Sequence, residues 1–393
     1  MPEKIVIHHL YKIFGPRPEE ALSLIEQGLH KDEIFSRIGH VVGVRDVSLR
    51  IEAGEVFVVM GLSGSGKSTL VRMINRLIEP TSGEILIDGE DVLSMSADEL
   101  VALRRRDIAM VFQSFALLPH MTVLENAAFG LEVAGVPRSE RRERAMHALE
   151  QVGLGRNADS RPDELSGGMK QRVGLARALA TDPTILLMDE AFSALDPLIR
   201  REMQEELLRL QEEHARTIVF ISHDLDEAMR IGDRIAMMEG GAVTQIGTPK
   251  EILDNPAADY IRDFFKDVDV SQVYAAEHAT DPEILALEAD EAGAAADLLR
   301  RLESEGRSYA YLLDGGARLR GVVSTESLRA ADGAGAADAV LPEPVRVRAG
   351  TPLGEVLGRI ARTPYPVPVV GRNGRFRGAV SRTSLLNALE KGG

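Results

Sequence analysis

The sequence predicts an α/β fold with a largely parallel sheet, followed by a smaller region of different character. From residue 1 to about residue 266, short apolar runs alternate with amphipathic helical stretches; the runs are VFVVM at 56–60, ILLMDE at 185–190 and TIVFIS at 217–222. Strands that alternate with helices in this way usually pair in parallel. After residue 266 the chain becomes rich in Ala, Gly and Arg and has no phosphate-binding motif. We therefore predict a domain boundary near residue 268.

Composition excludes several classes of function. The 393 residues are 44% hydrophobic, which is enough for two or three domains with packed cores. The absence of cysteine excludes disulfides, thiolate nucleophiles and cysteine-ligated metal sites. A net charge of -15 argues against a general nucleic-acid binder. The sequence has neither a run of eighteen apolar residues nor a signal-peptide pattern at its N-terminus, so we expect a cytoplasmic chain that does not span a membrane.

An insertion separates KIFG at 12–15 from VGVRDVSL at 42–49. Within it, Leu22, Ile25 and Leu29 recur at helical spacing. We predict one packed helix here, without a chemical role.

The C-terminal region contains an internal repeat. LLDGGARLRGVVSTESL at 312–328 aligns without a gap on VVGRNGRFRGAVSRTSL at 369–385, so that Gly321 matches Gly378 and Ser324 matches Ser381. Each copy has the pattern of a strand, a glycine-containing turn, a second strand and a helix. The repeat predicts two half-domains that form a pseudo-symmetric pair.

The strongest chemical motif is GLSGSGKST at 61–69, which follows an apolar strand and opens a probable helix. In a phosphate-binding loop the glycines let backbone N–H groups and the helix N-terminus face the phosphates. Lys67 would neutralise the β- and γ-phosphates of ATP, and Ser68 would bind Mg²⁺. The alternative is a Gly-Ser turn before a helix. The predicted nucleotide contacts in this loop are Gly61, Ser63, Gly64, Ser65, Gly66, Lys67, Ser68 and Thr69.

The apolar strand at 185–190 ends in two carboxylates. Asp189 is placed to hold Mg²⁺ through water, and Glu190 to orient or deprotonate the attacking water. An Asp-Glu pair after a strand is a weak signal by itself and gains its weight from the phosphate-binding loop.

A second glycine-rich helix start, LSGGMKQR, lies at 165–172. Backbone amides of Ser166, Gly167 and Gly168 would suit another phosphate group, whereas the alternative is a Gly-Gly helix cap. At this point the chain resembles the ABC ATPase family, whose signature is LSGGQ; Met169 replaces the usual Gln. The resemblance implies a helical subdomain and a head-to-tail dimer, with ATP between one phosphate loop and the partner's signature.

Further family landmarks match in order along the chain. Gln113 resembles the glutamine that contacts Mg²⁺ or water and reports to the membrane subunit. Asp196 closes SALD at 193–196, which resembles the loop that follows the catalytic carboxylate. His223 resembles the switch histidine near the γ-phosphate, and Phe14 the aromatic that stacks on adenine. The resemblance thus implies that Glu190, His223 and Gln113 carry hydrolysis.

A closer resemblance covers nearly the whole chain. HLYKIFG at 9–15, the insertion, DEAFSALDPLIR at 189–200 and SHDLDEAMRIGDRIA at 222–236 look like the ATP-binding subunits of bacterial glycine betaine/proline betaine importers, the ProV-like group. This implies an ABC ATPase domain at 1–268 and CBS domains at 272–335 and 338–391. CBS pairs often bind adenosine nucleotides through an Asp after the second strand, but Ser327 and Ser384 stand at those positions, which argues against ordinary nucleotide sensing.

The resemblance implies an ATP- and Mg²⁺-dependent motor that imports quaternary amine osmoprotectants and is regulated by its C-terminal region. Its expected partners are a second copy, membrane permease subunits and, indirectly, a substrate-binding protein, at the cytoplasmic face of the inner membrane. No nucleic acid is expected. Two alternatives are an ABC ATPase acting on nucleic acid or ribosomes, and a regulatory ATP-binding protein without turnover.

Overall fold

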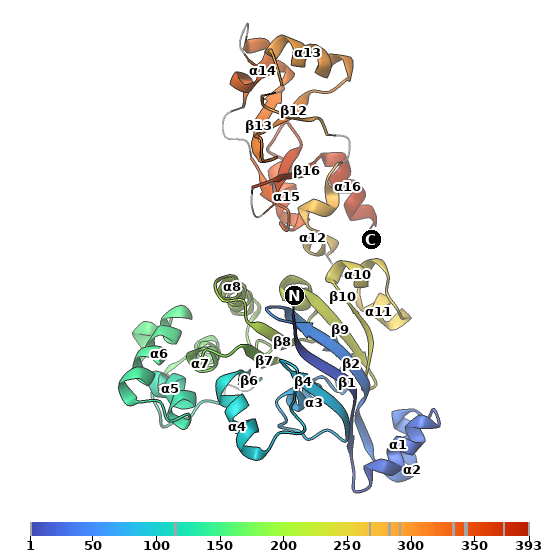
Figure 1. The fold of residues 1–393 in the computed structure, drawn as a ribbon, viewed down its shortest axis with the longest axis vertical. Helices are drawn as coiled ribbons and strands as arrows, with labels where there is room; N and C mark the ends of the chain where they lie inside the picture. The colour runs from blue at the N-terminus through green and yellow to red at the C-terminus, as the bar shows by residue number, and fades with distance from the viewer. Residues whose placement is uncertain are drawn as a thin grey trace. The chain divides into compact units, whose positions relative to one another are not determined.

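The computed structural model describes residues 2–113, 116–266, 269–281, 284–290, 292–331, 335–341, 345–371 and 374–391. It divides into two compact units, Met1–Phe265 and Lys266–Gly393 (Figure 1). The boundary predicted at residue 268 lies outside the described residues. No helix within the described ranges is long and apolar enough to cross a membrane.

The first unit is built on a six-stranded sheet with the order β10-β9-β3-β8-β7-β6, whose members are parallel except for β10. Every residue of β3, β7 and β8 is buried, as expected for strands covered on both faces. The prediction of an α/β fold with a largely parallel sheet is therefore confirmed. The bounds are β3 Val56–Gly61, β6 Ile108–Val111, β7 Ile185–Asp189, β8 Thr217–Ile221, β9 Arg234–Glu239 and β10 Ala242–Gly247.

A four-stranded antiparallel sheet, in the order β2-β1-β4-β5, shares its core with the parallel sheet. Strand β2 alternates buried residues with more exposed ones over most of its length, because one face packs on the core, whereas β1 has an irregular pattern with Ile5, Val6 and Ile7 all buried. The bounds are β1 Glu3–Phe14, β2 Val41–Glu52, β4 Ser82–Ile87 and β5 Glu90–Asp91.

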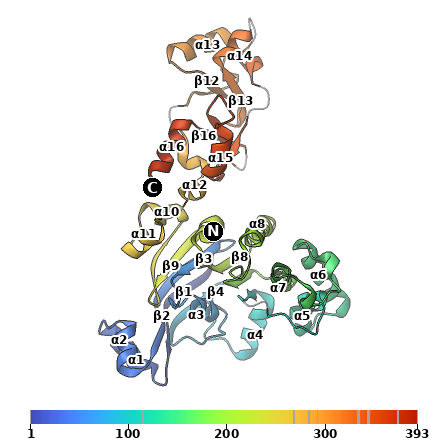
Figure 2. The same ribbon diagram turned by 180° about the vertical axis from the view of Figure 1, so that it is seen from behind.

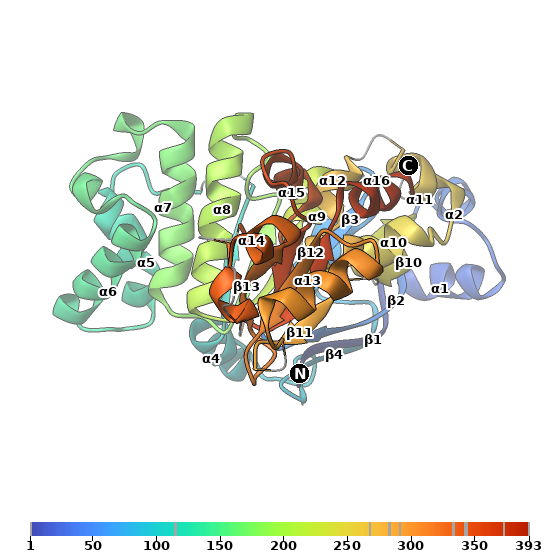
Figure 3. The same ribbon diagram turned by 90° about the horizontal axis from the view of Figure 1, so that it is seen from above.

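Helices α5, α6 and α7 pack against one another and form a helical group between β6 and β7 in the sequence (Figure 3). Helix α3 begins at Lys67, after the short loop that follows β3, and packs on the core of the parallel sheet. The helices of this unit, apart from the insertion, are α3 Lys67–Ile74, α4 Ala97–Arg106, α5 Val123–Val133, α6 Arg138–Gln151, η1 Gly155–Asn157, η2 Pro162–Glu164, α7 Gly167–Ala180, α8 Pro197–Glu213, α9 Leu225–Ile231, α10 Pro249–Asp254 and α11 Asp259–Phe264.

The insertion contains two short helices, α1 Pro18–Glu26 and α2 Lys31–Ile38, at the far end of β1 and β2 (Figure 2). The prediction of one helix through Leu29 was wrong, because the chain turns at Gly28, whose φ of 87° favours glycine. Leu29 still packs on the small core of the insertion, which explains why its spacing looked helical.

The second unit holds two three-stranded sheets of the same design, β11-β12-β13 and β14-β15-β16. In each, the first pair of strands is parallel and the second is antiparallel, followed by a helix. The predicted repeat of strand, turn, strand and helix is confirmed. The bounds are α12 Val270–Val273, η3 Ala276–Ala279, β11 Ala286–Glu288, α13 Ala295–Ser304, β12 Tyr309–Leu313, β13 Leu319–Ser324, α14 Thr325–Ala330, η4 Ala336–Ala339, β14 Val347–Arg348, α15 Leu353–Ile360, β15 Val367–Val370, β16 Phe376–Val380 and α16 Arg382–Lys391.

In this unit, the segment that precedes each half forms hydrogen bonds with the other half. The segment with η3 bonds to the later half through Asp281 N–H to Ala379 O at 2.9 Å, and Leu341 N–H bonds to Val322 O in the earlier half at 2.8 Å. A Cβ atom at Gly321 would lie 2.2 Å from Val340, and one at Gly378 would lie 2.9 Å from Thr280. The matching glycines of the repeat therefore make room for these segments.

Candidate nucleotide site

The phosphate loop is shaped by glycines that no other residue could replace. A Cβ atom at Gly61 would lie 2.1 Å from Met238 O, and one at Gly66 would lie 2.1 Å from Gly43 O. Both have positive φ, 146° and 98°, as does Gly64 at 73°. Ser63 is exposed in the loop and Thr69 lies in the first turn of α3.

The loop contains two polar groups suited to an anion. The ammonium of Lys67 donates to Gly61 O at 2.8 Å and to Leu62 O at 3.0 Å and is 5% exposed. Burial lowers the pKa of Lys67, while the charges of Glu190 and Asp189 act in the opposite direction. The buried Oγ atom of Ser65 has no hydrogen-bond partner among the described residues, which suits a ligand that supplies an acceptor.

Two of the candidate metal ligands, Ser68 and Asp189, meet where α3 faces the end of β7. Ser68 Oγ donates to Asp189 Oδ1 at 2.7 Å, and Arg72 Nη2 donates to Asp189 Oδ2 at 3.0 Å. Asp189 is 3% exposed, and each of its two carboxylate oxygens accepts one of these hydrogen bonds, as buried polar groups generally do. A hydroxyl beside a carboxylate is a donor set that Mg²⁺ accepts.

Glu190 lies at the centre of the predicted hydrolytic residues. Its Oε2 accepts a hydrogen bond from Gln113 Nε2 at 3.0 Å and lies 3.6 Å from His223 Nδ1. Gln113 also reaches Ser193 Oγ at 3.4 Å. With a φ of 47°, Glu190 adopts left-handed backbone that is unusual for a non-glycine residue and occurs often at functional sites. The structure thus brings Gln113, Glu190 and His223 together.

Gly43 lies close both to the ring of Phe14 and to Gly66 of the phosphate loop. Its ring is 42% exposed at the end of β1, and a Cβ atom at Gly43 would lie 2.8 Å from Phe14 Cε2. The same Gly43 contacts Gly66 of the loop. The ammonium of Lys12 lies 5.0 Å from the ring centroid. This position suits stacking on an adenine whose phosphates occupy the loop.

The signature residues lie elsewhere on the first unit. Ser166 caps α7 by accepting from Met169 N–H at 3.3 Å, and within the described part of the chain no hydrogen bond joins it to the phosphate loop. Gly167 is exposed, and Gly168 packs so closely on α8 that a Cβ atom would lie 2.5 Å from Ile199. Asp196 caps α8 and is exposed. Ser166, Gly167 and Asp196 are therefore exposed on the surface of the first unit, whereas Gly168 is packed against α8.

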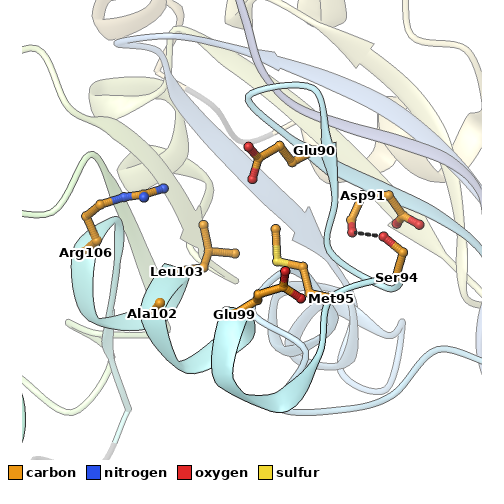
Figure 4. Close-up of a pocket in the computed structure, with 8 residues that line it drawn as sticks. All are labelled: Glu90, Asp91, Ser94, Met95, Glu99, Ala102, Leu103 and Arg106. Atoms are coloured by element: carbon orange, nitrogen blue, oxygen red, sulfur yellow. Dashed lines mark hydrogen bonds between the residues drawn. The ribbon is translucent and has the colours of Figure 1, made fainter.

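A separate hollow of about 420 Å³ lies between the β4–β5 hairpin and α4 (Figure 4). Ser94 Oγ donates to Asp91 O at 2.8 Å on one side of it. Its lining residues are Glu90, Asp91, Ser94, Met95, Glu99, Ala102, Leu103 and Arg106. None of the predicted site residues is among them, so the hollow is distinct from the nucleotide site.

Several residues of the site were missed at the sequence level. Arg72 follows Ser68 by four positions, so both lie on one face of α3, and this spacing would have revealed it. Gly43 gave no such signal, because its approach to Phe14 depends on the pairing of β1 with β2. Ser193 lies within the SALD motif, but its contact with Gln113 depends on the pairing of β6 with β7.

The sequence matches two family models, ABC transporter over residues 44–193 and CBS domain over residues 336–391. It is 56% identical over 396 residues to the glycine betaine/proline betaine transport system ATP-binding protein ProV of Salmonella typhimurium, covering 100% of this chain and 99% of the relative. It is 47% identical over 390 residues to the glycine betaine transport ATP-binding protein OpuAA of Bacillus subtilis, covering 99% and 93%.

Solved structures resemble the first unit. The dimeric structure of MJ0796, a bacterial ABC transporter cassette, is 35% identical with a TM-score of 0.53 and covers 62% of this chain and 98% of that chain. A dimeric post-hydrolysis state of the same cassette, bound to ADP and Pi, is 34% identical with a TM-score of 0.53.

Proposed function

This chain belongs to the family of ABC transporter ATP-binding proteins that includes the glycine betaine/proline betaine transport proteins ProV, and we propose that it is the ATP-hydrolysing subunit of a quaternary amine importer. The observation that carries the hydrolytic role is the meeting of Gln113, Glu190 and His223, beside the Ser68–Asp189 contact. A carboxylate held by an amide and an imidazole is placed to orient a water molecule for attack on the γ-phosphate.

In this proposal the phosphate loop binds ATP. The loop amides and Lys67 neutralise the β- and γ-phosphates, and Phe14 stacks on adenine. Glu190 orients the attacking water, Gln113 holds the Glu190 carboxylate in place, and His223 lies beside it near the expected γ-phosphate.

Ser68, Asp189 and Gln113 would hold Mg²⁺, which when bound neutralises charge on the β- and γ-phosphates. The short Ser68–Asp189 contact supports this assignment, since the two oxygens already lie together. Arg72 fixes the other carboxylate oxygen of Asp189.

We further propose a head-to-tail dimer with two shared sites. Support comes from the exposed Ser166 and Gly167, which make no hydrogen bond to the phosphate loop within the described ranges, and from the similarity to dimeric cassettes. The test is a linked heterodimer that combines Lys67→Ala in one copy with Ser166→Arg in the other. Both defects then fall on one composite site and leave the other intact, so one ATP should bind. Loss of all ATP binding would contradict sharing.

The segment after Gln113 is proposed to meet a membrane permease subunit. Leu118 of this segment is held by the buried Asn126 on α5, which accepts a hydrogen bond from Leu118 N–H at 2.8 Å and donates one to Leu118 O at 3.1 Å. Cysteines introduced at Ala116 and Leu118 should therefore cross-link to the permease. Cross-links obtained only from the opposite face would contradict this placement.

We propose that residues 272–335 and 338–391 form a regulatory pair of CBS domains. Ser327 and Ser384 are engaged in reciprocal capping bonds with Ser324 and Ser381, at 2.9 to 3.0 Å, which supports a role other than ribose binding. Control by ionic strength is the favoured signal, since salt at physiological strength screens charges beyond about 8 Å.

The proposed setting is the cytoplasmic face of the inner membrane, with a permease and, indirectly, a substrate-binding protein as partners. The direct test is glycine betaine uptake into proteoliposomes that contain this chain and its permease. ATP-dependent uptake should be lost with Lys67→Ala. ATP hydrolysis without uptake of any quaternary amine would contradict the transport assignment.

A further inference from the structure

Two loops that follow neighbouring strands carry the residues around Glu190. The loop after β7 contains Ser193, whose Oγ atom donates to Glu190 O at 2.9 Å and lies 3.4 Å from Gln113 Nε2. The loop after β8 contains His223, whose Nδ1 lies 3.6 Å from Glu190 Oε2. The distance between His223 and Glu190 therefore depends on how these two loops are held relative to each other.

One side chain, Arg200, joins the two loops. It lies in the first turn of α8, and its Nη1 donates to Asp224 Oδ2 at 2.8 Å, directly after His223. Its Nη2 donates to two carbonyls of the other loop, Leu195 O at 3.3 Å and Ser193 O at 3.5 Å. The guanidinium is 23% exposed, so solvent screens these contacts only partly. A planar fork of this kind fixes both distance and direction, which a lysine cannot do.

The Asp224 end of this connection is anchored in the interior. Asp224 Oδ1 caps α9 by accepting from Glu227 N–H at 3.2 Å, and Asp224 N–H donates to Ser222 Oγ at 2.9 Å. Ser222 in turn bonds to the buried carboxylate of Glu227, which also accepts from Gln204 on α8 at 3.1 Å. These hydrogen bonds hold the loop that carries His223 against α8 and α9. Arg200 links this loop to the loop of Ser193.

We propose that Arg200 is a positioning residue for ATP hydrolysis, which holds the Ser193 loop and the His223 loop in register and thereby sets the approach of His223 to Glu190. The proposal rests on the hydrolytic function proposed above. Arg200 makes none of the phosphate-loop contacts, so its loss should impair turnover and leave ATP binding intact.

The test compares Arg200→Met and Arg200→Lys with Arg230→Met in the assembled transporter. Arg230 is the matched control, because it pairs with Glu205 at 2.7 Å and so also joins α9 to α8, but touches neither loop. Arg200→Met should lower kcat by about tenfold or more, as expected for the loss of charged hydrogen bonds, with the ATP dissociation constant changed less than about twofold. Arg200→Lys keeps the charge and should recover only part of kcat. Arg230→Met should match the wild type.

A double variant tests the route of the effect. Asp224→Asn keeps the oxygen that caps α9 and weakens the bond to Arg200, so its loss of kcat should add little to that of Arg200→Met. Wild-type kcat in Arg200→Met, or a parallel loss of ATP affinity and thermal stability without a change in kcat, would overturn the positioning role. If the wild-type transporter itself lacked ATPase activity, the proposed function would fail instead.

Discussion

Ser68 Oγ donates to Asp189 Oδ1 over 2.7 Å, although the two residues lie 121 positions apart in the chain. The contact joins the start of α3 to the end of β7 and brings two of the three candidate metal ligands together. Preformed ligands of this kind reduce the ordering that binding would otherwise require.

The first prediction concerns this pair. Ser68→Ala should weaken ATP binding in the presence of Mg²⁺ by about tenfold, since one oxygen ligand and one charged hydrogen bond are lost. With the metal chelated, wild type and variant should bind ATP alike. Ser36→Ala serves as the control, because Ser36 Oγ bonds only to Asp32 O on α2 among the contacts of the described residues. A metal-independent loss in Ser68→Ala would argue against a ligand role.

The second prediction concerns the adenine side of the site. Gly43→Ala would place a Cβ atom 2.8 Å from the Phe14 ring and should displace it. Loss of base stacking costs about 1–3 kcal/mol, so ATP affinity should fall by about fivefold to a hundredfold. Gly358→Ala is the control, because nothing lies within 4 Å of the added atom. Equilibrium titration with ATP measures both, and unchanged affinity in Gly43→Ala would contradict the placement of Phe14.

The third prediction is a pH dependence of stability. Burial raises the pKa of Glu227 above its ordinary value of 4.5, against opposing hydrogen bonds from Ser222 and Gln204. The folded state therefore holds this proton to higher pH than the unfolded state, and the stabilisation that it gives at low pH is lost as pH rises through the raised pKa. The melting temperature of Glu227→Gln should fall less than that of wild type as the pH is raised from about 4.5. The reverse trend would contradict the burial argument.

The fourth prediction concerns the pairing of the two halves in the C-terminal unit. Tyr311 is 2% exposed, stacks on Phe376 with ring centroids 5.2 Å apart and donates to Pro366 O at 2.6 Å. Tyr311→Phe should cost about 1 kcal/mol and Tyr311→Ala about 3–5 kcal/mol. Amide hydrogen exchange in both halves of the full chain should report the loss. Destabilisation confined to the earlier half would show that the halves fold separately.

The sequence predicted the parts of the fold that local patterns encode. The apolar runs at 56–60, 185–190 and 217–222 became β3, β7 and β8 because their length and composition fit buried strands. The prediction of a single helix in the insertion was wrong because the apolar spacing continues past the turn at Gly28. Periodicity alone therefore did not show where α1 ends.

For the site as well, local motifs were predictable from the sequence and tertiary contacts were not. The motif residues around the phosphate loop and Glu190 were found from sequence, since each motif is a short contiguous pattern. Arg200 was not found as a site residue: its carbonyl partners at 193 and 195 are local, but Asp224 comes within its reach only through the parallel pairing of β7 and β8. Contacts that depend on tertiary pairing have no spacing along the chain to reveal them.

The most direct test of the account is ATP turnover by Glu190→Gln in the assembled transporter. The substitution keeps the shape of the side chain and removes the carboxylate that is placed to orient water. We expect ATP binding close to that of wild type, no measurable hydrolysis, and a dimer held closed on ATP. Hydrolysis by Glu190→Gln at a rate near that of wild type would contradict it.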